Sequence, residues 1–458
     1  MDNPLSFFKE ERVEFKNIFQ RFKRADFRGN SGAAIKNSTY QLALNLVMKF
    51  GSLFFTIIIT RMLLPEKFGL YTLALSTIVF FSAFSDLGIK SAVITFISKK
   101  LSEKNKAKAK DYFSKLLKWK FLLLILIAAI LIASSYFIAN YYYNKPIFYT
   151  LLIGGLYVFA FGFVSFMEQT FKATNDFKRP LIKEFIFQAL RFILVPIAIL
   201  LMVNNNYTPE MIVFGVLLTI IACYTLTLLY LLVSAKKKLY FLKEKGRSLN
   251  KNEIKELSKF TIPLAATSLS GVFFGYIDIF MLGRFVEESF IAFYSAAFSL
   301  AGSLAVIIGF TAIALFPVFA RMKGKALEKI FERTRLFTFI ISFLGAAFVF
   351  FFAPQVIHIV FGVEYAPSST FLRYLSILVL ILPTISLYFN YFISQKKTKI
   401  VAKLLIGSTI INIILNYLFI KYGLTFGMFE AVIGVCLATI ISKCLYFAGL
   451  IFFHKKWK

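Results

Sequence analysis

The apolar positions of this chain come in long runs, and charged segments separate the runs. Each run has about 20 residues or more, which is the length a helix needs to cross a hydrocarbon core of about 30 Å. Alternating segments of about 10 residues, typical of a transmembrane β-barrel, do not occur. The pattern therefore predicts an all-α polytopic membrane protein.

About twelve such runs can be counted along the chain, and a basic, polar stretch separates the sixth from the seventh. The predicted spans are 38–62, 69–98, 118–140, 147–171, 181–202, 209–234, 259–284, 290–320, 335–360, 368–394, 400–421 and 427–453.

Charge is distributed unevenly between the loops. The 458 residues include 53 Lys and Arg against 23 Asp and Glu, a net charge of +30, and 59% of the residues are hydrophobic. About 43 of the 53 basic residues fall on one side of the predicted spans and about 6 on the other. Since cytoplasmic loops accumulate Lys and Arg, we expect a cytoplasmic membrane protein with both termini in the cytoplasm. The same rule accounts for the charge without nucleic acid, which we do not expect as a partner.

These observations divide the chain into four parts. The predicted parts are a cytoplasmic basic N-terminal segment (1–37), an N-lobe of six spans (38–234), a cytoplasmic linker (235–258), and a C-lobe of six spans with a basic tail (259–458).

The two halves repeat one another weakly. After a shift of 223 positions, "RMLLPEKFGLYTLALS" lies over "RFVEESFIAFYSAAFS", so that Arg61 falls on Arg284 and Tyr71 on Tyr294. Both copies end a span in arginine, turn through an acidic elbow and begin the next span with an aromatic residue and tyrosine. Because six spans per half is an even number, the repeat predicts two six-helix lobes related by a pseudo-twofold axis along the membrane normal.

The same stretches resemble a known family. "RMLLPEKFGLY", followed by "DLG" at the end of the second span, and "DIFMLGRF" in the second half are similar to the motifs of polysaccharide biosynthesis transport proteins. The resemblance implies a Wzx-type flippase of lipid-linked oligosaccharides in the multidrug/oligosaccharidyl-lipid/polysaccharide exporter superfamily. MurJ and the MATE drug exporters are relatives within that superfamily.

Two basic residues lie deep inside predicted spans. Lys49 is about 16 Å from either end of the first span, and Arg191 is about 15 Å inside the fifth. Because a midplane cation costs about 3 kcal/mol, both are expected to face a wet cavity or a partner. A structural pair with a neighbouring carboxylate is the alternative for Lys49. For Arg191, the alternative is a side chain that snorkels past the backbone at Pro196.

A flippase for a lipid-linked sugar must carry a phosphate or pyrophosphate through the hydrocarbon layer, and basic side chains in its cavity would offset the desolvation of that anion. The candidate cations are Lys49, Arg191, Arg61, Arg284 and Arg373. For Arg61 an interfacial anchor is the alternative. Polar side chains within the spans could hydrogen-bond the glycan or join helices. These candidates are Gln41, Asn45, Asn390, Asn412 and Asn416.

Asp278 is the candidate for ion coupling. It lies about 9 Å inside Arg284 on its span, and the aligned position in the first half is Phe55. A carboxylate buried there could bind a proton or Na⁺, whereas an ion pair with Arg284 or Arg373 is the alternative. Asp86 and Lys90, near the end of the second span, are expected to neutralise each other as i, i+4 partners on one helix.

The leading hypothesis is a lipid-linked oligosaccharide flippase that works by alternating access without covalent chemistry, and the alternative is a MATE-like cation or drug antiporter. A membrane glycosyltransferase would need catalytic carboxylates in substantial outer loops, and the predicted outer loops are short. A Walker A motif does not occur.

Neither the three cysteines nor the two histidines have metal-ligand spacing, so no metal site is expected. No cofactor is expected beyond a Na⁺ or H⁺ gradient. The expected partners are the lipid-linked glycan, membrane lipids and glycan-assembly enzymes.

Overall fold

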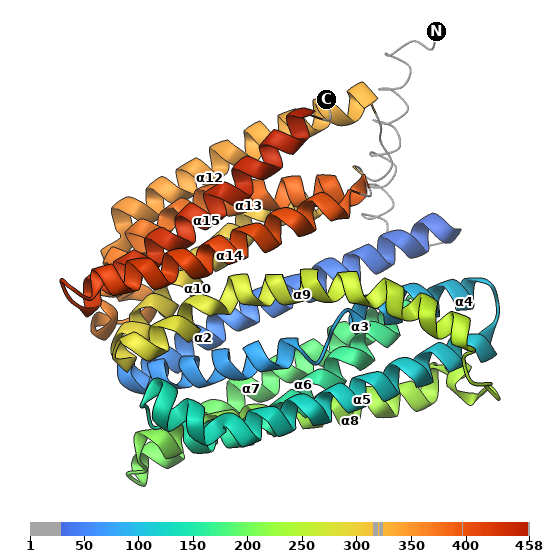
Figure 1. The fold of residues 1–458 in the computed structure, drawn as a ribbon, viewed down its shortest axis with the longest axis horizontal. Coiled ribbons are helices and arrows are strands. Elements are labelled where there is room, and N and C mark those ends of the chain that lie inside the picture. Colours follow the sequence, from blue (N-terminus) through green and yellow to red (C-terminus); the bar gives the residue numbers. More distant parts are fainter. Residues whose placement is uncertain (1–28, 315–318, 320–323, 396, 457–458) are drawn as a thin grey trace.

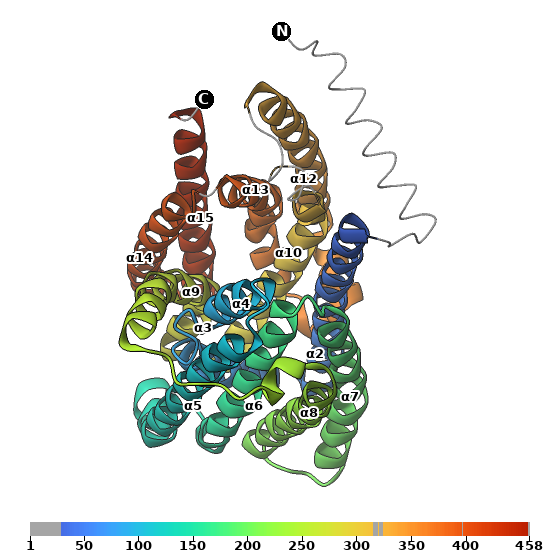
Figure 2. The same ribbon diagram turned by 90° about the vertical axis from the view of Figure 1, so that its right-hand side faces the viewer.

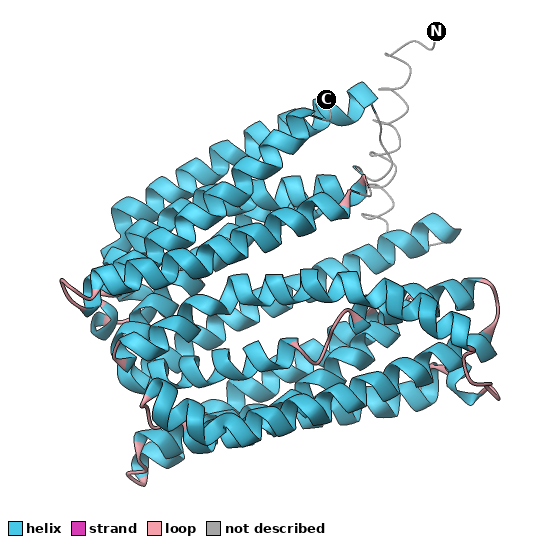
Figure 3. Ribbon diagram, viewed as in Figure 1, coloured by secondary structure: helices cyan, strands magenta, loops and turns pink. Residues whose placement is uncertain are grey.

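The computed structural model describes residues 29–314, 319, 324–395 and 397–456. Helices make up nearly all of this part, which contains no strand (Figure 3). Most of the predicted N-terminal segment (1–28) and the end of the eighth predicted span lie outside the described residues.

In the described part of the first half there are five long helices and several short pieces. Its elements are α2 (Gly29–Ala83), α3 (Ile89–Ala92), η1 (Val93–Ile97), α4 (Ser98–Ser102), α5 (Lys106–Phe137), η2 (Ile138–Tyr143), α6 (Phe148–Ala173), α7 (Lys178–Asn204), α8 (Pro209–Lys238) and η3 (Tyr240–Lys243). Those of the second half are α9 (Lys251–Phe285), α10 (Glu288–Ala314), α12 (Gly324–Phe361), η4 (Val363–Tyr365), α13 (Ser368–Ser394), α14 (Thr398–Gly423) and α15 (Met428–Lys456).

The first two predicted spans lie in the single element α2. A straight helix from Thr39 to Ala83, 45 residues, would be about 68 Å long, far more than a hydrocarbon core requires. The backbone breaks at Leu64 (φ 61°, ψ 171°), directly before Pro65, which has no N–H to continue the helix. The chain then turns back on itself (Figure 1). The eleven candidate membrane-spanning helices of the described residues therefore correspond to the twelve predicted spans.

The second span ends earlier than predicted. Its helix stops at Ala83, and a turn with positive φ at Leu87 (39°) and Gly88 (81°) precedes α3. The i, i+4 helical pairing of Asp86 with Lys90 was therefore a wrong prediction, and the described residues contain no ion pair between them. The turn is held by another lysine, because the ammonium of Lys120 on α5 donates to the carbonyl of Ser85 (2.8 Å).

The two halves pack in the same way. In the first half α2 packs on α7, α5 on α6, and α7 on α8, and the matching pairs in the second half are α9 on α14, α12 on α13, and α14 on α15. The result is two six-helix lobes, which Figure 2 shows as a blue-to-green bundle and a yellow-to-red bundle. This confirms the predicted fold class.

The lobes meet most closely at one end of the molecule. We call this end the elbow face, because it carries the turns at 62–69 and 285–288; the basic face is the opposite end, where α2 begins and α15 ends. Figure 1 shows the lobes converging toward the elbow face and diverging toward the basic face. Helix α9 lies between them: near the basic face its Phe260 packs edge-on against Phe96 of the N-lobe (5.3 Å between ring centroids).

Candidate functional site

Lys49 projects from α2 on the side of the C-lobe. Gly51 and Phe55 of α2 contact α7 within the N-lobe, and Lys49 lies about 200° around the helix from Gly51. Thr60 is about three turns further along the Lys49 face, and its carbonyl accepts a hydrogen bond from Tyr365 of the C-lobe (3.3 Å). The Lys49 side chain is exposed, and it makes no hydrogen bond or ion pair with any described residue.

Polar residues continue along this face at helical spacing. Gln41 donates to Asn45 (3.1 Å), and Asn45 precedes Lys49 by one turn. Ser52 and Thr56 follow Lys49 on the same side. We call Gln41, Asn45, Lys49, Ser52 and Thr56 the α2 stripe. It brings two predicted polar residues and one predicted cation together on a face that points between the lobes.

Arg191 has a different environment from Lys49. Its guanidinium donates to the carbonyl of Gly51 (3.1 Å) and to the amide oxygen of Gln188 (2.6 Å). It also lies over the rings of Phe55 (4.0 Å) and Phe187 (5.1 Å). The side chain therefore joins α7 to α2 inside the N-lobe, on the opposite side of α2 from Lys49.

A buried charged network that we did not predict extends from Arg191 along α7. Gln188 donates to Glu184 (2.6 Å), Glu184 pairs with Lys183 (2.9 Å), and Lys183 also pairs with Glu168 on α6. Glu184, Gln188 and Arg191 share one helix face, a spacing that was visible in the sequence. Which neighbouring helix they face was not.

Asp278 is the centre of a second buried network, in the C-lobe. The carboxylate is 2% exposed and accepts hydrogen bonds from Asn416 (2.6 Å), Tyr294 (2.6 Å) and Thr439 (2.7 Å). Asn416 also donates to Asn412 (3.3 Å). Four helices, α9, α10, α14 and α15, thus meet at one carboxylate. Among the described residues no cation contacts it directly, and the two asparagines join helices rather than face an open space.

The elbow arginines lie where the lobes meet. Arg61 of the N-lobe donates to the carbonyls of Ile359 and Val360 of the C-lobe, the latter at 3.0 Å. Arg284 of the C-lobe donates to the carbonyls of Tyr141 (3.2 Å) and Tyr142 (2.7 Å) of the N-lobe. The predicted cavity cations Arg61 and Arg284 therefore each contact residues of the other lobe, which are far away in the sequence. The two arginines occupy equivalent positions in the repeat.

Two further contacts close the elbow face. Lys145 of the N-lobe pairs with Glu288 of the C-lobe (3.1 Å). A Cβ added to Gly69 would lie 1.9 Å from the backbone oxygen of Glu288, so only glycine permits this approach of the two elbows.

The remaining predicted site residues are not gathered with these groups. Arg373 is exposed near the start of α13 and makes no side-chain hydrogen bond or ion pair with the described residues. Asn390 donates to the carbonyl of Ser386 on its own helix (2.9 Å). In the described part of the chain no three His, Cys, Asp or Glu residues are grouped in a way that could hold a metal ion.

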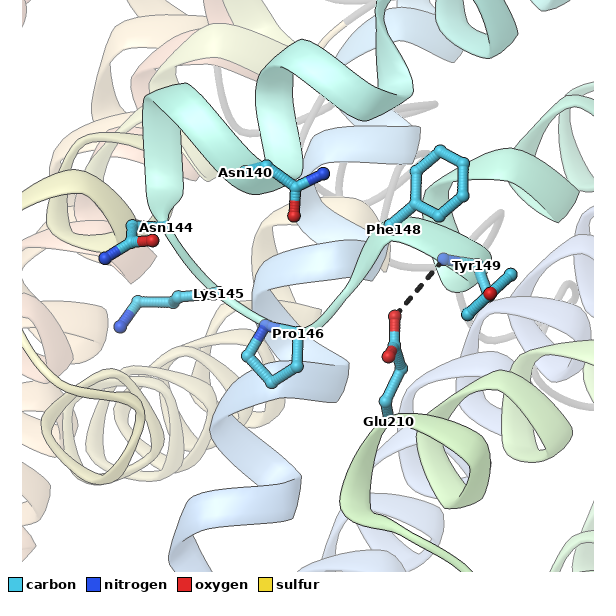
Figure 4. A pocket seen from close by; sticks show the side chains of 7 residues that line it. All are labelled: Asn140, Asn144, Lys145, Pro146, Phe148, Tyr149 and Glu210. Carbon is cyan, nitrogen blue, oxygen red and sulfur yellow. Dashed lines mark hydrogen bonds between the residues drawn. The ribbon is translucent and has the colours of Figure 1, made fainter.

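A polar pocket of about 440 Å³ on the elbow face was missed by the sequence analysis. Figure 4 shows Asn140, Asn144 and Lys145 on one side and Glu210 on the other, where its carboxylate accepts from the backbone N–H of Tyr149 (3.4 Å). No sequence pattern signalled it, because two separate loops build it.

Several solved structures similar to this fold are transporters. A lipid II flippase MurJ in an inward closed conformation matches with a TM-score of 0.69 and 16% identity, over 91% of this chain and 87% of that one. An inward-facing MATE family multidrug resistance transporter matches with a TM-score of 0.65 and 16% identity, over 91% and 94%. A eukaryotic MATE transporter matches with a TM-score of 0.62 and 13% identity, over 95% and 96%. At such identities the likeness shows the fold alone.

Family models match both halves of the sequence. No curated protein sequence matches the chain. A model described as MatE matches residues 263–418, and one described as polysaccharide biosynthesis protein matches residues 34–323, which is more than half of the chain. The chain therefore belongs to the polysaccharide biosynthesis protein family.

Proposed function

We propose that this protein is a flippase that moves a lipid-(pyro)phosphate-linked oligosaccharide across the cytoplasmic membrane by alternating access, for the synthesis of surface polysaccharide or another glycan. The observation that carries the proposal is Lys49, a cation deep in a membrane span that points between the lobes and makes no ion pair with the described residues. Family membership and the fold of a lipid II flippase support the same reading. No covalent step is part of the mechanism.

The cargo explains the cost of placing Lys49 there. A cation near the bilayer midplane costs about 3 kcal/mol in the absence of a partner. A phosphate that enters the space between the lobes loses part of its hydration. A charge-assisted hydrogen bond from the Lys49 ammonium would compensate for that loss. Next to it, the amides and hydroxyls of the α2 stripe offer hydrogen bonds to a glycan, whereas the acyl tail stays in lipid.

The distribution of charge supports an orientation. The segments 98–106 and 236–251, both rich in lysine, lie on the basic face with the two ends of the described chain. By the positive-inside rule the basic face belongs in the cytoplasm. The lobes diverge on that side, so the cargo would enter from the cytoplasm, where glycan-assembly enzymes are candidate partners.

A MATE-like cation or drug antiporter is the second candidate, and Asp278 is the observation that favours it. The MatE match includes this carboxylate, and an antiporter for cations needs one. In the structure, however, Asp278 accepts three hydrogen bonds and is buried inside the C-lobe. We therefore propose that Asp278 couples transport to Na⁺, a hard cation that takes oxygen ligands, or to H⁺, which the carboxylate itself accepts, and that it does not bind a drug.

The test is translocation of a polyprenyl-pyrophosphate-linked oligosaccharide in proteoliposomes. Lys49→Ala should slow translocation at least about tenfold, because one charge-assisted hydrogen bond to the phosphate is lost. Lys49→Arg should retain most of the activity, since it keeps the charge. Lys67→Ala is the matched control, because it removes a lysine of the elbow that makes no ion pair with the described residues.

Two outcomes would contradict the proposal. One is wild-type translocation by Lys49→Ala. The other is transport of a cationic dye coupled to Asp278 in the absence of any glycan translocation, which would establish the antiporter instead.

A further inference from the structure

The last carbonyls of a helix have no partner inside the helix and carry the negative end of its dipole. Helix α12 ends at Phe361, and the N–H of Gly362 takes the carbonyls of Ile357 and His358. The next two carbonyls, those of Ile359 and Val360, accept from Arg61 of the other lobe. The N-lobe thus caps a helix of the C-lobe.

The C-lobe caps a helix of the N-lobe in the same way. The π-helical segment η2 ends at Tyr143, and the N–H of Lys145 takes the carbonyl of Ala139. The carbonyls of Tyr141 and Tyr142 accept from Arg284. Each arginine ends the first span of its lobe, and each capped helix is the third span of the opposite lobe. The two contacts are therefore equivalent under the pseudo-twofold relation.

From this geometry we infer that Arg61 and Arg284 form a two-armed latch that holds the lobes together on the elbow face. The ion pair between Lys145 and Glu288 also joins the two lobes on this face and is part of the latch. Every contact of the latch joins one lobe to the other, so separation of the lobes on this side breaks all of them together. If the protein transports as proposed above, release of both arms is a step of each cycle.

The two arms also favour the state in which the elbow face is closed over the state in which it is open. A guanidinium donates to two carbonyls at once, a geometry that the single ammonium of lysine does not reproduce. Both carbonyls lose their protein partner when the lobes separate. With the latch intact, the resting protein is closed on the elbow face.

The latch can be tested by the distance between two spin labels in the full chain. The labels replace Tyr207 and Phe426, which are 54% and 67% exposed in elbow-face loops of the N-lobe and C-lobe. The background protein has Cys223, Cys436 and Cys444 replaced by alanine. Pulsed electron paramagnetic resonance then measures the distance between the labels in the absence of substrate. It gives the ratio of the open population, with a long distance, to the closed population, with a short one.

Removing either arm should raise the open population. Arg61→Ala and Arg284→Ala should each increase the open-to-closed ratio about tenfold, and the double variant about a hundredfold, because each removes charge-assisted bonds to two carbonyls. Arg61→Lys should give a smaller increase. Lys67→Ala, which removes a charge from the same elbow, should leave the ratio unchanged. An equal effect of Lys67→Ala and Arg61→Ala would overturn the latch.

A charge exchange gives a test that does not depend on truncating an arginine. Lys145→Glu and Glu288→Lys should each open the elbow face by like-charge repulsion, and the double exchange should close it again. Failure of the double exchange to restore the closed distance would remove the ion pair from the latch.

The latch and the proposed function can fail separately. Unchanged label distances in the arginine variants, with normal glycan translocation, would overturn the latch and leave the flippase. Increased distances in a protein whose wild-type form moves no glycan would leave the latch and overturn the proposed function.

Discussion

At the scale of single residues, two cations on either side of α2 have different surroundings. Lys49 faces the space between the lobes, whereas Arg191 is held by Gly51, Gln188 and two rings inside the N-lobe. Depth along a span could be predicted for both from the count of residues. The helical spacing of the polar residues around each cation was visible in the sequence, but it could not show whether that face meets the other lobe or a helix of the same lobe.

The close contact at Gly51 makes a prediction about stability. A Cβ at this position would lie 2.4 Å from the side-chain carbon of Gln188, so Gly51→Ala must displace Gln188 from Glu184 and Arg191. The helix gains about 1 kcal/mol from alanine, but two hydrogen bonds to charged groups, about 1.5–3 kcal/mol each, are disturbed. With both hydrogen bonds lost, we expect a net loss of about 2–5 kcal/mol, measured as a lower midpoint of thermal unfolding in detergent.

Gly407→Ala is the control for that substitution. A Cβ at Gly407 on α14 meets no atom within 4 Å, so only the gain in helix propensity remains. Its midpoint should rise or stay the same. A rise in Gly51→Ala of the same size would show that Gln188 moves aside without loss.

At the scale of elements, most helices could be predicted from their apolar runs, but breaks inside them only in part. Pro65 indicated the break at Leu64. The turn at Leu87 and Gly88 was missed, because Asp86 and Lys90 on either side of it were expected to pair on one continuous helix. The contacts of Arg61 were also beyond prediction, since their partners are about 300 residues away in the chain. The weak sequence repeat shows that the two elbows are equivalent, but it does not show which residues they contact.

The elbow itself supplies a prediction at this scale. In Gly69→Ala the new methyl group would meet the backbone oxygen of Glu288, which cannot rotate away as a side chain can. We expect the two elbows to move apart and the open-to-closed ratio of the spin-label experiment to rise about tenfold or more, the effect expected of the single arginine variants. Gly302→Ala on α10, where a Cβ meets nothing within 4 Å, should leave the ratio unchanged. A closed distance in Gly69→Ala would show that the elbows tolerate the extra atom.

At the scale of the whole molecule, the two lobes place opposite charges at equivalent interfaces. Where α2 packs on α7, the buried group is the cation Arg191, and where α9 packs on α14 it is the carboxylate Asp278. Asp278 aligns with Phe55, the residue whose ring lies under the Arg191 guanidinium. A common architecture thus carries a buried cation in one lobe and a buried carboxylate at the equivalent interface of the other.

This division predicts how ions affect the protein. If Na⁺ binds at Asp278, it should stabilise the folded protein by about 2.7 kcal/mol at a concentration of about 100 times its dissociation constant. The rise of the unfolding midpoint with Na⁺ at constant ionic strength, set by choline, should be lost in Asp278→Asn. A response to lower pH in place of Na⁺, again lost in Asp278→Asn, would identify H⁺ as the coupling ion. A response to either ion that persists in Asp278→Asn would place the coupling site elsewhere.

The break at Leu64 has a consequence for biosynthesis. Because the chain reverses within a few residues, the first two spans can leave the insertion machinery as one helical hairpin rather than as separate segments. If the first span were inserted alone, it would bear the whole free-energy cost of placing Lys49 in lipid, about 3 kcal/mol. In a hairpin the apolar residues of both segments share that cost, and Arg61 lies three residues before the break at Leu64 that forms its tip.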